Sequence, residues 1–111
     1  MRPVSLDLGA NQTSNVWECV SGGMNVHIRG TFSAQTVTLK VSATSKDGTY
    51  TDYAVKNAAG TLTTQTFTAE ETVCYLAAGQ FFKASVSNGG SPVIDVFVEP
   101  MNRDSVVQIY A

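Results

Sequence analysis

The sequence predicts an all-β domain built as an antiparallel β-sandwich, either Ig-like or jelly-roll-like, with about eight short strands. Short runs of alternating apolar and polar residues are separated by turn residues roughly every 8–12 positions. No run with helical spacing stands between the predicted strands, which argues against a parallel α/β sheet. At 111 residues, the chain has the length of one domain and should bury roughly two-thirds of its unfolded surface.

The clearest strand signals span residues 24–32 and 36–42. In each of them apolar side chains recur at every second position, which is typical of a half-buried strand. The apolar positions are Met24, Val26, Ile28, Gly30 and Phe32 in the first run, and Val37, Leu39 and Val41 in the second. Because so few residues separate the two runs, we expect them to pair as a hairpin.

The whole chain, 1–111, forms a single β domain in this interpretation. Residues 14–100 make the sandwich body. Residues 1–13 form an N-terminal arm or an edge strand, and residues 101–111 form a C-terminal arm or a last strand. Turns are expected at Asp47-Gly48 and at 57–60, where Asp, Asn and Gly residues gather.

Composition and charge exclude several classes of function. Charged residues make up 14% of the chain, against about 25% in an average domain. The seven basic residues are scattered and the net charge is −2, so we expect no nucleic-acid partner. No apolar run is long enough for a membrane helix, and the first residues lack the apolar stretch of a secretory signal.

Catalysis, metals and cofactors are not expected. His27 is the sole histidine; it shares a polar strand face with Arg29 and is predicted to be a surface residue. The acidic residues show no spacing that would pair them across a cleft or around an ion. For Cys19 and Cys74, two states remain open: free thiols or a bridge between the sheets.

The C-terminal half is apolar on both faces of its predicted strands. Adjacent residues of a strand point to opposite faces, so one member of the Phe81-Phe82 pair must be covered by something other than the core. We therefore expect that either a third layer or a partner subunit covers this second face. If it is a partner subunit, the predicted members of the interface are Phe81 or Phe82, Val93, Asp95 and Phe97.

The stretches VHIRGTFSAQTVTLKVSATSKDGTY and LAAGQFFKASVSNGGSPVIDVFVEP resemble small structural proteins of tailed bacteriophages. The matching features are a G-T-F strand, a V-T-L-x-V-S strand, a D-G turn, an L-x-A-G turn and an N-G-G loop. They cover residues 24–99. The chain departs from the pattern after the D-G turn, where Thr49-Tyr50 stands in place of a Trp that is frequent there.

The resemblance implies a capsid decoration or cement protein of the β-sandwich type. Such a protein is made in the host bacterial cytoplasm, forms a homotrimer and binds the major capsid protein on the virion surface. The terminal segments would supply the capsid contacts, at Leu6, Leu8, Val107, Ile109 and Tyr110.

Two other functions stay open at this point. One is a tail or head–tail connector subunit, and the other is a carbohydrate-binding or host-adhesion module. The latter would need exposed aromatic side chains, for which the candidates are Trp17, Tyr50 and Tyr53.

Overall fold

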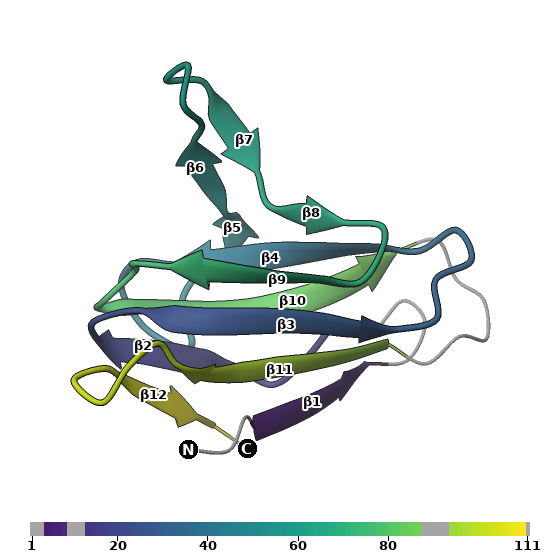
Figure 1. Cartoon of the computed structure of the whole chain (residues 1–111). Helices are drawn as coiled ribbons and strands as arrows, with labels where there is room; N and C mark the ends of the chain where they lie inside the picture. The colour runs from purple at the N-terminus through teal and green to yellow at the C-terminus, as the bar shows by residue number, and fades with distance from the viewer. Residues whose placement is uncertain (1–3, 9–12, 88–93, 111) are drawn as a thin grey trace.

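Two antiparallel sheets form the body, as the sequence predicts (Figure 1). The computed structural model describes residues 4–8, 13–87 and 94–110, with side chains for the latter two ranges. The first sheet has the order β1–β11–β3–β9, with bounds Val4–Leu8, Ile94–Pro100, Met24–Gly30 and Glu71–Tyr75. The second has the order β12–β2–β10–β4–β5, with bounds Val106–Ile109, Trp17–Ser21, Gln80–Ser87, Thr36–Ser42 and Thr51–Asp52.

Three further strands complete the described fold. β8 (Thr66–Phe67) pairs with β4 at the edge of the second sheet. β6 (Ala54–Lys56) and β7 (Leu62–Thr64) form a separate two-stranded sheet that projects from the body (Figure 1). The turn expected at 57–60 joins these two strands.

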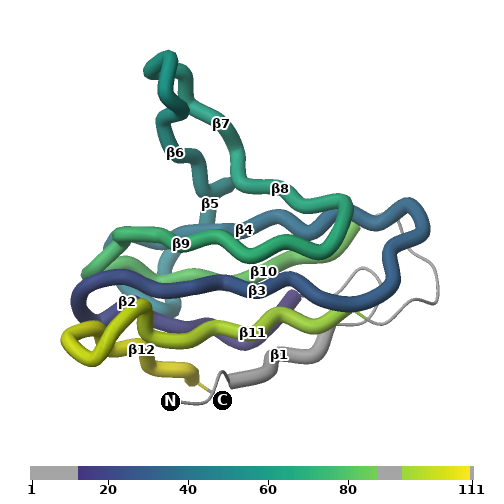
Figure 2. The backbone as a smooth tube through the Cα atoms, in the orientation of Figure 1, coloured from purple at the N-terminus to yellow at the C-terminus, as the bar shows by residue number. Residues whose placement is uncertain are grey.

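The strand order is that of a jelly roll. From β1 to β4 and again from β9 to β12, each strand lies in the other sheet from the one before it, as the tube in Figure 2 allows the reader to follow. An Ig-like sandwich instead keeps several consecutive strands within one sheet. With β5 as the fifth strand, the two sheets have the jelly-roll order, and β12 is added beside β2.

The predicted hairpin between residues 24–32 and 36–42 is wrong, although both strands exist. β3 pairs with β11 and β9, whereas β4 pairs with β10, β5 and β8. The connection crosses between the sheets. Within it, the buried Gln35 side chain accepts hydrogen bonds from the backbone N–H groups of Ser33 and Ala34, at 2.7 and 3.1 Å. Two strands with one apolar face each can bury those faces against each other instead of pairing by their edges.

Both terminal segments are edge strands in this structure. β1 pairs with β11 in the register Val4↔Val98 to Leu8↔Ile94. β12 pairs with β2, with a register shift between Val106 and Val107. These strands extend the two sheets on the same side of the body (Figure 1).

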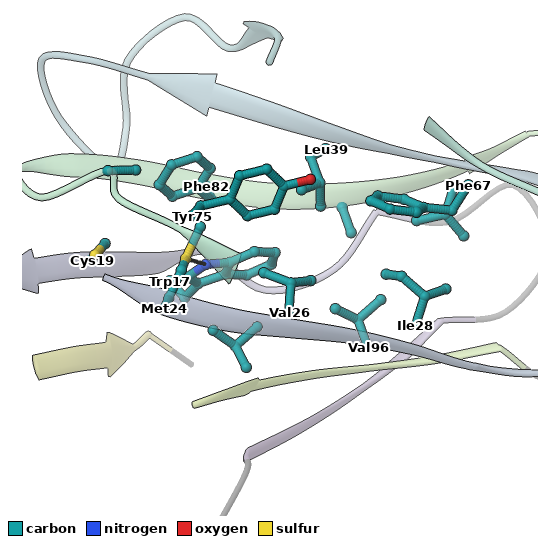
Figure 3. Packing of buried hydrophobic residues seen from close by; sticks show 14 of the residues in the cluster. Trp17, Cys19, Met24, Val26, Ile28, Leu39, Phe67, Tyr75, Phe82 and Val96 are labelled. Atoms are coloured by element: carbon teal, nitrogen blue, oxygen red, sulfur yellow. Dashed lines mark hydrogen bonds between the residues drawn. The ribbon is translucent and has the colours of Figure 1, made fainter. Parts of the chain in front are cut away.

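The core lies between the sheets, where the alternating apolar residues meet (Figure 3). Trp17 stacks on Phe82 with ring centroids 6.0 Å apart, and its indole Nε1 lies 3.2 Å from the Met24 sulfur. Tyr53 meets Phe82 edge-on at 5.1 Å. Burial of each large apolar side chain contributes on the order of 1.5–3 kcal/mol, so this layer holds the sheets together.

Candidate functional site

The outer face of the first sheet gathers polar side chains around one aromatic ring. Thr72 on β9, His27 on β3 and Phe97 on β11 lie side by side in one cross-strand row, because their backbones pair directly. Asn25 and Glu99 form the next row. Polar positions of three strands that are distant in sequence thus meet on one surface.

A hydrogen-bond network fixes these side chains. His27 Nε2 lies 2.9 Å from Glu99 Oε1, which also accepts a 3.4 Å bond from Asn25 Nδ2. His27 Nδ1 lies 3.0 Å from Thr72 Oγ1. Arg29 Nη2 donates to the same hydroxyl oxygen at 2.7 Å, and its Nη1 donates to two backbone carbonyls. The contact between His27 and Glu99 was not predicted from the sequence.

The network holds Glu99 as an ionised acceptor of hydrogen bonds. The hydrogen bond from His27, with a second from Asn25, lowers the pKa of Glu99 below its usual value, so the carboxyl is ionised near neutral pH. An ionised carboxylate can only accept hydrogen bonds, so His27 Nε2 donates to Glu99, and the Thr72 hydroxyl lies at hydrogen-bond distance from Nδ1. The order acid–imidazole–hydroxyl is that of nucleophilic enzymes. Here Arg29 Nη2 also donates to the Thr72 hydroxyl oxygen, at 2.7 Å.

A shallow, open hollow of about 290 Å³ lies on this face. Its lining residues are His27, Arg29, Phe97 and Glu99. Phe97 is half-buried and points away from the core, whereas its neighbours Val96 and Val98 are buried in it. The hollow therefore combines an aromatic surface with hydrogen-bonding groups.

The predicted subunit interface does not form one surface. Phe82 is fully buried in the core. Phe81 lies on the outer face of the second sheet, with its ring centroid 6.4 Å from that of Tyr110. Asp95 and Phe97 lie on the opposite side of the molecule, on the outer face of the first sheet. Val93 lies outside the described residues.

Of the predicted capsid contacts, Leu6 and Leu8 lie on β1, Val107 and Ile109 lie on β12, and Tyr110 directly follows β12. Val107 and Ile109 pack partly against the core. The Tyr110 hydroxyl donates to Glu18 at 2.6 Å, a bond that raises the pKa of the tyrosine. Leu6 and Leu8 pair with Val96 and Ile94 in register, and their side chains lie outside the described residues. The segment from Val106 to Tyr110 is therefore docked on this domain.

The β6–β7 hairpin is a feature that the sequence did not reveal as a projection. Its base is tied to the body by backbone bonds from Gln65 N to Tyr53 O and from Tyr53 N to Leu39 O, at 2.8 and 2.9 Å. The Tyr75 hydroxyl donates to the Gln65 side chain at 2.6 Å. Beyond this base, Leu62 is 65% exposed. A firmly anchored base thus carries an apolar side chain into solvent.

Both cysteines are free thiols: Cys19 is buried and Cys74 is exposed. Within the described ranges, no three His, Cys, Asp or Glu side chains gather as metal ligands would. Of the aromatic residues considered for carbohydrate binding, Trp17 is fully buried, while Tyr53 packs against Phe82 and Tyr75. Tyr50 lies under the Lys83 ammonium at 4.4 Å.

The described residues contain no helix long and apolar enough to cross a membrane. Comparisons with protein-family models, with curated proteins and with solved structures find no match to this chain.

Proposed function

We propose that this chain is a non-enzymatic structural protein of a tailed-phage virion, a decoration or cement protein that binds the major capsid protein and stabilises the head. The observation that carries the proposal is the projecting β6–β7 hairpin with its exposed Leu62. An isolated two-stranded hairpin is at best marginally stable in water. A hairpin retained outside the core, on an anchored base, suits contact with a second protein.

The composition of the hairpin supports a protein partner. Between residues 54 and 64 there is one charged side chain, Lys56, and no proline. Soluble proteins usually protect exposed strand edges with charges, prolines or bulges. An edge with so little protection is suited to pairing with a strand of the capsid subunit, with Leu62 entering an apolar pocket.

Two broader features are compatible with this function. The sequence resembles tailed-phage structural proteins over residues 24–99. Jelly rolls build viral capsid domains as well as lectins and cupins, so the topology alone is an analogy. In this proposal the protein lies on the outside of the capsid as a trimer. Sedimentation of the isolated protein measures its oligomeric state.

The first test is cosedimentation with empty heads assembled from the major capsid protein of a phage whose genome encodes this chain. We expect saturable binding of the wild type, and binding at least about tenfold weaker for Leu62→Asp, because charge at the centre of an apolar contact is costly. Val20→Asp is the matched control, since Val20 is an apolar residue of the body that is 43% exposed. Absence of wild-type binding, or equal binding by all three proteins, contradicts the proposal.

The copy number per virion separates this function from the connector alternative. A decoration protein covers the head in many copies, whereas a connector subunit forms one ring at a single vertex. Quantitative mass spectrometry of virions measures the ratio to the major capsid protein. A single ring of copies would replace the decoration function by the connector function.

A further inference from the structure

The outer face of the first sheet has the chemistry of a ligand site, and this surface is separate from the projecting hairpin. Phe97 contributes a half-buried ring that is not part of the core cluster. Glu99 lies two positions after Phe97 on the same face of β11. His27 lies directly across from Phe97 on the neighbouring strand β3. An aromatic ring and polar groups are thus immediate neighbours on one face of the sheet.

The polar groups are held in place before any ligand arrives. Glu99 is positioned by His27 and Asn25, at 2.9 and 3.4 Å. Arg29 is positioned by Thr72 and by the Ile28 and Glu71 carbonyls, at 2.7, 2.8 and 3.1 Å. A ligand that meets fixed groups does not have to order them, which lowers the entropic cost of binding.

The charge on this face is mixed, and this narrows the class of ligand. An anion attracted by Arg29 would also meet the carboxylate of Glu99, and a cation attracted by Glu99 would meet the guanidinium. A neutral molecule that both donates and accepts hydrogen bonds avoids this conflict. Its hydroxyl groups can donate to Glu99 and accept from Arg29.

We propose that this face binds a neutral saccharide, with a sugar ring packed on Phe97 and its hydroxyl groups bonded to Glu99 and Arg29. The C–H groups on one side of a sugar ring are compatible with the electron-rich face of an aromatic ring. The shallow, open form of the hollow suits one or two units of an extended chain better than an enclosed small molecule. The inference does not rest on the capsid function.

The sole histidine provides the probe, because its ring resonances report on the centre of the network. The full-length protein is titrated by NMR with cellohexaose, maltohexaose and chitohexaose, each up to about 10 mM, a range that detects even millimolar affinity. We expect a saturable shift of the His27 ring signals with at least one of the three. A charged oligogalacturonate serves as comparator and should bind more weakly.

Three variants distinguish the aromatic contact from a general loss of structure. Phe97→Leu keeps an apolar side chain but removes the flat ring, and should weaken binding about tenfold or more. Phe97→Tyr keeps the ring and should retain binding. Phe81→Ala removes a half-buried ring from the opposite outer face and should bind as the wild type does.

Four results would overturn the inference. They are no shift with any neutral hexasaccharide, a shift with the anionic oligomer alone, undiminished binding by Phe97→Leu, and loss of self-association in Phe97→Leu. The last result, measured by sedimentation velocity, would show that a second copy of the chain covers this face instead.

Discussion

Replacing Phe82 by alanine tests which face of β10 points into the core of the sandwich. Phe82 is fully buried, stacks on Trp17 at 6.0 Å and receives the edge of Tyr53 at 5.1 Å. Loss of a buried phenylalanine costs about 3–5 kcal/mol through lost burial and the cavity left behind. That is a large part of the roughly 5–15 kcal/mol expected for the whole fold.

Phe81→Ala is the matched control, one residue away on the same strand. Its ring is half-buried on the outer face and lies 6.4 Å from the ring of Tyr110. We expect this change to cost about 1 kcal/mol or less. Both variants replace a phenylalanine by alanine on the same strand. The difference between their free energies of unfolding therefore measures the effect of burial.

Urea unfolding followed by the fluorescence of Trp17, the sole tryptophan, measures both free energies. With a slope of about 2 kcal/mol per M, Phe82→Ala should lower the unfolding midpoint by about 2 M, and Phe81→Ala by less than about 0.5 M. Equal shifts, or a larger shift for Phe81→Ala, would refute the assignment of faces.

Three further predictions concern the network, a turn and the thiols. Because the folded-state pKa of Glu99 is lowered, its charge stabilises the fold above the unfolded pKa and this contribution is lost as pH falls through the folded value. The stability difference between wild type and Glu99→Gln, measured by urea unfolding, should therefore shrink in acid; a constant difference from pH 7 to about pH 3 contradicts the pairing. Gly22→Ala should cost at least about 2 kcal/mol by the same assay, because φ is 68° and a Cβ would lie 2.4 Å from the Ser105 hydroxyl; wild-type stability would show that the turn rearranges freely. A thiol reagent should modify Cys74 at once and Cys19 only after unfolding, since burial raises the pKa of the Cys19 thiol; two fast reactions would contradict this.

The strands were predictable because their signal is local. The alternation at Met24, Val26 and Ile28 identifies β3 and its buried face without knowledge of any partner. Which strand lies beside β3 is a non-local property. A connection of a few residues serves a hairpin and a crossing between sheets equally well, and this is why the predicted hairpin was wrong.

The candidate site was hidden for the same reason. His27 and Glu99 were both identifiable as polar positions on strands, yet they are 72 residues apart in sequence. Only the pairing of β3 with β11 brings them to 2.9 Å. The apolar character of both faces in the C-terminal half was visible in the sequence, but the assignment of Phe81 and Phe97 to opposite sides required the topology.

The pairing of β1 with β11 has a consequence for how this chain is made. About 90 residues separate Val4 from Ile94, so at roughly 5–20 residues per second the first strand waits about 5–20 s on the ribosome for its neighbour. β3 waits for the same partner. The β6–β7 hairpin joins strands that are close in sequence, but an isolated hairpin is at best marginally stable, and its base is bonded to Leu39 of β4. The part of the molecule proposed to meet a partner is thus fixed only when the body that carries it has formed.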